Sequence, residues 1–319
     1  MLFGSKEPSK PIPFPYECST IEFKSYRHSF GGVDFVCVKS SPASSEESVV
    51  KGAPKARLLI LHGFDEHALI YSRLMDHLAH FGIECFVFEQ RGSGQTSVGK
   101  LRGVTDEFNT FRDLDHFIEW NLQDKEKATS LFLFGHSMGG GIVLNYGCNG
   151  KYKDKISGII CTGPLVTLHP HTAPSAFLTL ASPLLAKFLP RFRIDTGLDL
   201  EATTSDERYR EFLSHDPLTV PLYGSFRQIY DFLERGKRLA RDRAHVAQFR
   251  APVLIFHGED DTINDPIGSQ SFYDLCPVSD KRLRLFPQAR HALCLETDET
   301  FEQLVEELQS WISERVTTV

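Results

Sequence analysis

The chain contains no long hydrophobic run. Nowhere among its 319 residues is there an uninterrupted apolar stretch of the roughly 18 to 20 residues that a membrane-spanning helix needs, so any membrane contact should be peripheral. It has no C-x-x-C pair either, and its seven cysteines are irregularly spaced, which argues against structural zinc and against a disulfide framework. Basic residues are not in excess, because the formal net charge is −7, and this argues against nucleic acid as a partner.

The N-terminal residues lack the apolar centre of a secretory signal peptide. Together with the odd number of cysteines, this predicts a reducing, intracellular compartment. An apolar fraction of 41% and a charged fraction of 24% are typical of a soluble globular protein, and the length allows one large domain or two small ones.

What the sequence does contain is a G-x-S-x-G motif in a specific setting. The apolar residues 131–134 run directly into the motif at 135–139, and residues 142–146 suit a helix. A strand, a sharp turn and a helix are the setting in which this motif forms a nucleophile elbow, where small neighbours allow the serine a strained backbone conformation. The sequence therefore predicts that Ser137 is a catalytic nucleophile.

Short apolar runs alternate with helix-period segments along most of the chain. Extended runs at 20–26 and 33–38 predict an antiparallel hairpin at a sheet edge. Further buried strands are predicted at residues 57–61, 83–88, 131–134, 156–161, 253–256 and 283–286, and helices at residues 71–81, 105–122, 138–147, 268–276 and 298–316. This alternation indicates an α/β protein whose mostly parallel central sheet has helices on both faces.

One interval interrupts the alternation. Between residues 164 and 249 there is no strand-like run, and prolines and short amphipathic segments dominate. An interval of this length is far longer than an ordinary connection between two strands. We therefore predict that residues 165–249 form an inserted helical cap over Ser137, and that residues 1–164 and 250–319 form the core.

A nucleophilic serine needs a base, and the base needs a carboxylate that fixes its tautomer. After a nucleophile elbow these partners are expected at the ends of later strands, in the order serine, acid, histidine. Asp260, Asp261 and Asp265 follow the strand at 253–256, and Asp261 is the preferred acid because it is the third residue after the loop glycine. Asp260 or Asp265 suits a cap of the next helix instead. His291 follows the last strand and is the predicted base.

Acyl transfer also forms an oxyanion, which needs N–H donors already in position. One predicted donor is the backbone N–H of Met138, directly after the nucleophile. The second is the backbone N–H of Phe64, in the H-G-F turn that follows the strand at 57–61. His136 precedes the nucleophile and is predicted to have a structural role.

With these residues in place, the chain resembles an α/β-hydrolase, and most of all the fungal monoacylglycerol lipases. The resemblance covers nearly the whole chain and rests on residues 62–64, 90–94, 135–141, 195–200, 221–225 and 257–265. The first three segments recur across many hydrolases, whereas those of the cap narrow the match to this family. The resemblance implies that Ser137, Asp261 and His291 form a catalytic triad and that Phe64 and Met138 form the oxyanion hole.

Two positions depart from the family's pattern. Asp65 stands where the family's H-G-x-G-E turn has its second glycine, and Glu89 stands where the D-Q-R-G segment has aspartate. Asp65 is tolerable if it adopts a left-handed conformation, which aspartate does more readily than most residues. Neither change removes a catalytic group.

The cap carries an apolar stripe. Phe177, Leu184 and Phe188 recur at helical spacing within residues 175–189, and Pro183 is expected to divide this segment into two short helices. Two interpretations remain open at this point. The stripe either packs on the core, or it faces outward, lines an acyl entrance and contacts a membrane surface, with the neighbouring basic residues near lipid head groups.

The resemblance implies a serine hydrolase that cleaves a monoacylglycerol, or a similar single-chain lipid ester, to fatty acid and glycerol without a metal or organic cofactor. It implies peripheral contact of the cap with a membrane or lipid droplet, and a cytoplasmic location at lipid droplets or the endoplasmic reticulum. A lysophospholipase, a broad-specificity carboxylesterase or an acyltransferase would use the same residues. A non-catalytic binding module with the hydrolase fold is the alternative from a different class.

Overall fold

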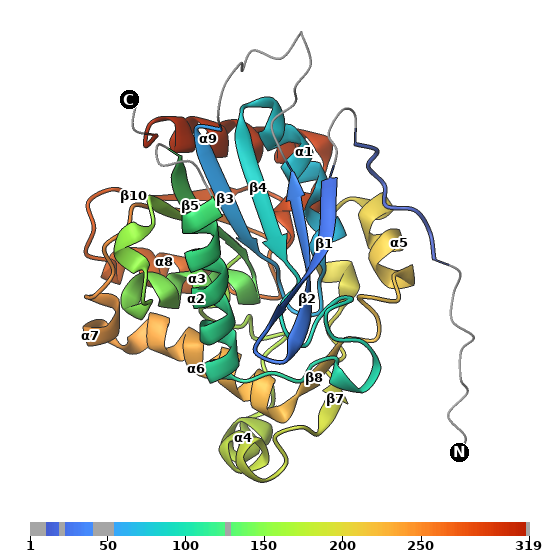
Figure 1. Ribbon diagram of the computed structural model, residues 1–319. Coiled ribbons are helices and arrows are strands. Elements are labelled where there is room, and N and C mark those ends of the chain that lie inside the picture. The colour runs from blue at the N-terminus through green and yellow to red at the C-terminus, as the bar shows by residue number, and fades with distance from the viewer. Residues whose placement is uncertain (1–10, 19–22, 41–53, 125–128, 317–319) are drawn as a thin grey trace.

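The structure is a computed structural model that describes residues 11–18, 23–40, 54–124 and 129–316. Its centre is an eight-stranded sheet with the order β1-β2-β4-β3-β5-β6-β9-β10 (Figure 1). The strands are β1 (Phe23–Phe30), β2 (Val33–Ser40), β3 (Ala56–Leu61), β4 (Ile83–Phe88), β5 (Ser130–His136), β6 (Gly158–Thr162), β9 (Val253–Gly258) and β10 (Lys281–Phe286). The predicted α/β-hydrolase fold is confirmed.

The sheet is parallel except at one edge. β1 and β2 form the predicted antiparallel hairpin, and β2 pairs antiparallel with β4, whereas β3, β4, β5, β6, β9 and β10 run parallel to one another. Residues 20–22 of the first predicted run lie outside the described residues. Because the six strands are parallel, their carboxyl ends meet at one edge of the sheet, where ligands bind in α/β folds.

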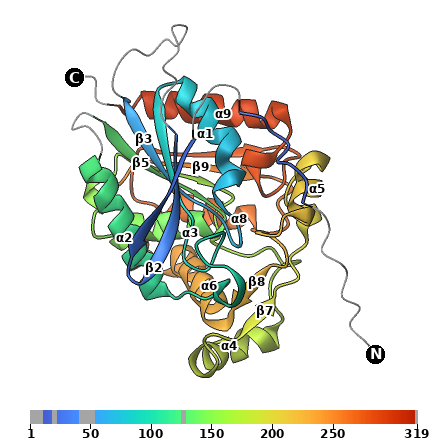
Figure 2. The ribbon, with the colours of Figure 1, turned by 45° about the vertical axis from the view of Figure 1, so that its right-hand side comes forward.

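Helices cover both faces of the sheet, as predicted (Figures 1 and 2). The helices are α1 (Ser72–His80), α2 (Glu107–Asp124), α3 (Met138–Asn149), α8 (Pro266–Leu275) and α9 (Asp298–Ser313). Leu58 and Ile60 of β3 pack with residues of α1 and α9, whereas Leu59 and Leu61 pack with residues of α2, α3 and α8. Successive side chains of a strand point to opposite faces, so a continuous apolar run supplies two core layers at once.

The connection between β6 and β9 carries α4 (Ala176–Phe188), α5 (Glu207–His215), α6 (Phe226–Arg241) and α7 (Arg243–Val246). It also contains a small antiparallel pair, β7 (Arg193–Asp195) with β8 (Tyr223–Ser225). The prediction of no strand in this interval is wrong for these segments, because three-residue strands are too short to give a periodic signal. α4 packs on α6 and lies at the far end of the molecule from α9 (Figures 1 and 2).

Pro183 does not divide residues 175–189 into two helices. α4 is one continuous helix with Pro183 inside it, so the predicted break is wrong. Proline lacks the N–H that would bond to the carbonyl four residues earlier, which here is that of Thr179. The hydroxyl of Ser182 donates to this carbonyl at 2.8 Å and replaces the missing donor.

No helix of the described residues is long and apolar enough to cross a membrane.

Candidate active site

Ser137 lies at the predicted strand–turn–helix elbow. β5 ends at His136 and α3 begins at Met138, and Ser137 between them has φ 53° and ψ −117°. Gly139 allows the helix to start this close to the sheet, because a Cβ at that position would lie 2.2 Å from the carbonyl oxygen of Leu61. The start of α3 therefore packs directly against the carboxyl end of β3.

Hydrogen bonds to the neighbouring strand hold the elbow in place. The N–H of Ser137 donates to the carbonyl of Thr162 at 3.0 Å, and the N–H of Leu165 donates to the carbonyl of Ser137 at 2.9 Å. The side-chain amide of Asn264 donates to the carbonyl of Gly163 at 2.8 Å and lies 3.5 Å from the Ser137 hydroxyl. Ser137 is thus fixed to the ends of β6 and of the loop after β9.

Asp261 and His291 form a buried pair at the same edge. Nδ1 of His291 donates to Oδ2 of Asp261 at 2.7 Å, and the other oxygen of Asp261 accepts the N–H groups of Ile263 at 2.8 Å and Asn264 at 2.9 Å. Burial alone would raise the pKa of Asp261, but the charge of His291 and the hydrogen bonds of both neighbouring histidines outweigh it, so the pKa lies well below its usual range. Asp261 therefore stays ionised and fixes one tautomer of His291.

The structure brings Ser137 near this pair through Gly163. A Cβ on Gly163 would lie 3.2 Å from Nδ1 of His291 and 3.3 Å from Oδ2 of Asp261, and Gly163 directly follows the residue that binds the Ser137 N–H. Of the two rejected acids, Asp265 is the N-cap of α8 and accepts the N–H of Ile267 at 2.9 Å, whereas Asp260 is exposed.

His136 is tucked behind the elbow. Its ring centroid lies 4.8 Å from that of His291, and its Nδ1 lies 3.0 Å from the carbonyl oxygen of Thr162. Burial lowers the pKa of His136 to about 4, although the charge of Glu66 opposes the shift. A neutral, buried ring bonded to the backbone agrees with the predicted structural role.

The turn after β3 aims the backbone N–H of Phe64. Nε2 of His62 accepts the N–H of Gln90 at 2.8 Å, so Nδ1 carries the proton and donates to the carbonyl of Gly63 at 2.8 Å. In a trans peptide the C=O and the following N–H point in opposite directions. The contact on the Gly63 carbonyl therefore sets the direction of the Phe64 N–H, and the carboxylate of Glu66 closes the turn by accepting the Gly63 N–H at 2.6 Å.

Both departures from the family's pattern are accommodated. Asp65 has φ 55°, so it adopts the left-handed conformation that makes the change tolerable. Glu89 is buried, and its carboxylate accepts the N–H of Ala68 at 3.3 Å and that of Gln95 at 2.6 Å. Glu89 therefore joins the segments that follow β3 and β4.

His257 is a residue that the sequence reasoning missed. It is fully buried near the end of β9, where Nε2 lies 3.1 Å from Oδ2 of Asp261 and Nδ1 lies 2.7 Å from the hydroxyl of Ser269. Asp261 is thus flanked by two histidines. The available signal was a histidine four residues before the predicted acid, at the end of an otherwise apolar strand.

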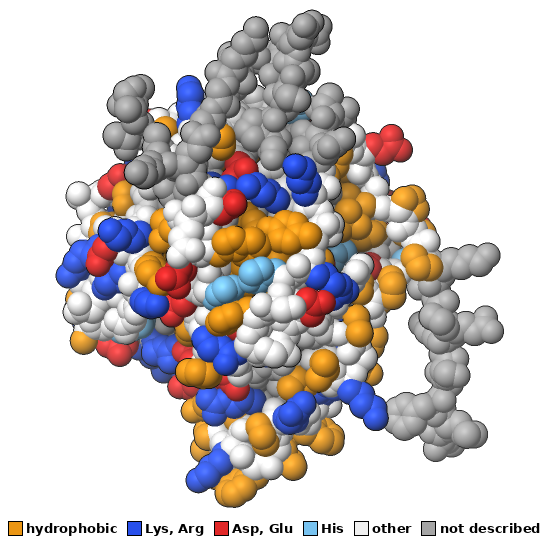
Figure 3. All heavy atoms as spheres, viewed as in Figure 1, with side chains coloured by type: hydrophobic (Ala, Val, Ile, Leu, Met, Phe, Trp, Pro, Cys, Tyr) orange, Lys and Arg blue, Asp and Glu red, His pale blue; other side chains and the backbone are white. Residues whose placement is uncertain are grey.

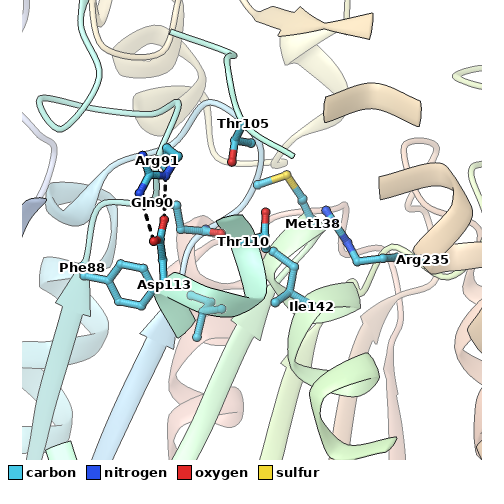
Figure 4. Close-up of a pocket in the computed structure, with 10 residues that line it drawn as sticks. Phe88, Gln90, Arg91, Thr105, Thr110, Asp113, Met138, Ile142 and Arg235 are labelled. Atoms are coloured by element: carbon cyan, nitrogen blue, oxygen red, sulfur yellow. Dashed lines mark hydrogen bonds and ion pairs between the residues drawn. The ribbon is translucent and has the colours of Figure 1, made fainter. Parts of the chain in front are cut away.

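Among the described residues, two cavities are lined by residues near Met138 or by residues of α2 and the second half of α3, and neither is lined by Ser137, Asp261 or His291. One of about 10 Å³ is enclosed beside Met138 and is lined by Gln90, Thr105 and Arg235 (Figure 4). This volume is close to what one water molecule needs. The other, of about 320 Å³, is lined by charged residues that include Glu107 and Arg238. Among the described residues, no group of three or more His, Cys, Asp or Glu side chains is placed to hold a metal ion.

Comparison with known proteins identifies the family of the chain. The family model described as Hydrolase_4, serine aminopeptidase S33, matches residues 52–298. The monoglyceride lipase of Saccharomyces cerevisiae is 49% identical over 96% of this chain and 98% of its own length, and a putative monoglyceride lipase of Schizosaccharomyces pombe is 35% identical over 83% of this chain and 69% of its own.

A solved structure also matches. The crystal structure of a soluble variant of the Saccharomyces cerevisiae monoglyceride lipase with a substrate analogue superposes with a TM-score of 0.89 at 48% identity, over 96% of this chain and all of that one. The chain therefore belongs to the Hydrolase_4 family of the α/β-hydrolase fold and is a relative of the yeast monoglyceride lipase.

Proposed function

We infer that this protein is a monoacylglycerol lipase, a serine hydrolase that cleaves the ester bond of a monoacylglycerol and releases fatty acid and glycerol. The observation that carries the inference is the 49% identity with the yeast monoglyceride lipase over almost the full length of both chains. An elbow serine next to a buried Asp–His pair agrees with it.

In the proposed reaction, the hydroxyl of Ser137 attacks the ester carbonyl while His291 takes its proton. Asp261 holds the imidazole in the required tautomer and stabilises its charged form. When the tetrahedral intermediate collapses, His291 donates the proton to the departing glycerol oxygen, and the acyl group remains on Ser137. A water molecule, deprotonated by the same histidine, then attacks the acyl carbonyl, and His291 returns the proton to the Ser137 oxygen as the fatty acid leaves. Ser137, His291, Asp261 and one water molecule are thus sufficient for both steps.

We propose that the N–H groups of Phe64 and Met138 bind the oxyanion. Met138 is the first residue of α3, where unbonded N–H groups and the helix dipole favour negative charge. Phe64 belongs to the turn whose peptide direction is set by His62. A donor of this kind contributes about 10²- to 10³-fold to kcat.

We also propose that residues 165–249 act as the cap and that α4 contacts a lipid surface. Ala186 is the buried residue of α4, whereas Phe177 is 78%, Leu180 80% and Phe188 70% exposed. Hydrophobic side chains and basic ones gather over α4 at the end of the molecule (Figure 3). Burying one large apolar side chain contributes about 1.5 to 3 kcal/mol, so a few of them would give reversible binding.

The proposed location is the cytoplasm, with peripheral association to lipid droplets or the endoplasmic reticulum. The apolar face of α4 supports the lipid contact. Six of the seven cysteines are buried and all seven are free thiols, which suits a reducing compartment.

A side-by-side assay tests the proposed activity. We expect the purified protein to hydrolyse a long-chain monoacylglycerol faster than the matching diacylglycerol, lysophosphatidylcholine and an aminoacyl p-nitroanilide. The Ser137→Ala variant should release no fatty acid from the monoacylglycerol. Faster cleavage of lysophosphatidylcholine would make the protein a lysophospholipase, and faster cleavage of the anilide would make it an aminopeptidase, as its family description reads. Either result would overturn the proposal.

A further inference from the structure

Asp65 occupies a backbone conformation that favours glycine. Its φ is 55°, and among the described residues Ser137 and Gln288 are the other non-glycine residues with positive φ. The family pattern that the chain resembles has glycine here. A non-glycine residue keeps such a conformation only where contacts with its surroundings stabilise it. Strained residues of this kind cluster at functional sites. The contacts of the Asp65 side chain are therefore informative.

Asp65 is joined to the cap by an arginine. Its side chain is 1% exposed, and its Oδ1 accepts a hydrogen bond from Nε of Arg102 at 2.9 Å. The terminal nitrogens of Arg102 donate to the carbonyls of Pro217 at 3.1 Å and of Thr219. One guanidinium group thus links the turn after β3 to residues 217–219.

A second pair joins the same two segments. Nε2 of His67 lies 2.7 Å from Oδ2 of Asp216, and both side chains are buried. The hydroxyl of Thr219 donates to the same carboxylate oxygen at 2.7 Å. His67 therefore contacts Asp216 directly, and Asp65, on the other side of Glu66, is linked to residues 217–219 through Arg102.

These contacts lie directly beside the proposed oxyanion donor. His62 and Glu66 hold the peptide groups before Phe64, and Asp65 holds the chain immediately after it. We propose that Asp65 is a positioning residue whose ion pair with Arg102 ties the oxyanion turn to the cap and keeps the Phe64 N–H aimed at the substrate carbonyl. This inference rests on the proposed function, because it concerns the same oxyanion.

The charge on Asp65 depends on pH in the range where the enzyme can be assayed. Burial raises the pKa of Asp65 to about 6, although the hydrogen bond and charge of Arg102 oppose the shift. The other groups that face it are Asp195, which raises the pKa further, and the backbone of Tyr223, which lowers it. Above pH 6 the carboxylate is ionised and pairs fully with Arg102, and below pH 6 it becomes neutral.

Asp65→Asn reproduces the neutral form at every pH, and asparagine accepts a left-handed conformation. We would measure kcat and KM for a short, water-soluble p-nitrophenyl ester from pH 5 to pH 8.5, with Asp195→Asn as the matched charge change nearby. At pH 8 the kcat of Asp65→Asn should be about 10-fold below wild type with little change in KM, because the donor is misdirected rather than lost. At pH 5 the two should agree within about two-fold.

The proposal would be overturned if the ratio of kcat between wild type and Asp65→Asn were the same at every pH. It would also be overturned if Asp195→Asn lowered kcat by the same factor. Hydrogen exchange supplies a second readout that needs no activity. At pH 8, Asp65→Asn should speed exchange in residues 62–67 and in residues 216–220 together, and a change confined to one segment would contradict the link. If Asp65→Asn does not fold, Asp65→Gly, which suits the backbone, takes its place. If the wild-type protein has no esterase activity but Asp65→Asn still speeds exchange in both segments, the proposed function is refuted and the link between the segments stands.

Discussion

β5 and α4 are both predominantly apolar, yet they have opposite surroundings. Residues 131–136 of β5 are all buried, whereas in α4 Ala186 is the buried residue, and Leu180 and Leu184 are 80% and 62% exposed. In β5 the apolar side chains stabilise the fold and hold the serine at its end. In α4 the same kind of side chain contributes little to the fold, so its role is to be sought in contact with another apolar surface.

Substitutions in the two regions should have different effects, and the largest loss of activity should come from the end of β5. Ser137→Ala should lower kcat by about 10⁴- to 10⁶-fold, because members of a triad act as a unit and only binding and the oxyanion donors remain. The melting temperature should change little, and labelling by a fluorophosphonate probe should disappear. A variant that keeps a tenth of wild-type turnover would show that Ser137 is not the nucleophile.

The neighbouring acids give the next largest effect. Asp261→Asn should lower kcat by about 10⁴-fold, because an amide at this position favours the wrong tautomer of His291. Asp260→Asn makes the same chemical change one residue away on an exposed side chain, and its kcat should stay close to wild type. If the two effects were exchanged, Asp260 would be the triad acid.

The buried ring behind the elbow should affect stability in acid. Burial lowers the pKa of His136 from 6.5 to about 4, so the unfolded chain binds a proton between these values and the folded protein does not. The free energy of unfolding should therefore fall as the pH drops from 6.5 towards 4, by up to roughly 3 kcal/mol from this group. Urea unfolding at pH 7 and pH 4.5 should show a smaller drop for His136→Gln than for wild type, and an equal drop would refute this source.

The smallest effect should come from the proline in α4. Ser182→Ala removes the hydroxyl that satisfies the carbonyl left without a donor by Pro183, at a cost of about 1 kcal/mol to the helix. Because α4 is exposed, the change should speed hydrogen exchange in residues 176–182 while the global melting temperature stays the same. A fall in the melting temperature instead would mean that α4 is part of the core.

Much of the core could be predicted from the sequence, because its apolar runs are continuous and their glycines and turn residues mark the strand ends. Ser137, Asp261 and His291 each directly follow such a run or lie in the loop after it. Their positions along the chain were therefore enough to predict that they lie at the same edge of the sheet. His257 was missed because its role depends on a contact with Asp261 that no periodicity reveals. The helix through Pro183 was missed because a single hydroxyl, that of Ser182, decides it.

The direction in which the stripe of α4 faces could not be predicted for a related reason. Helical spacing places Phe177, Leu184 and Phe188 near one another, but it does not say whether that face meets the core or solvent. The outcome depends on α6, which packs against α4 and leaves these three side chains 62% to 78% exposed.

The most direct test of the difference between the two regions compares two substrates in one variant. Phe177→Ser, Leu184→Ser and Phe188→Ser are combined, and Phe108→Ser, on an apolar side chain of α2 that is 69% exposed, is the control. The triple variant should lose co-sedimentation with phosphatidylcholine vesicles and hydrolyse vesicle-bound monoacylglycerol slowly, while its rate on a short soluble ester and its melting temperature stay at wild-type values. Equal loss on both substrates with a lower melting temperature would mean that α4 supports the fold, and would contradict the proposed contact of α4 with a lipid surface.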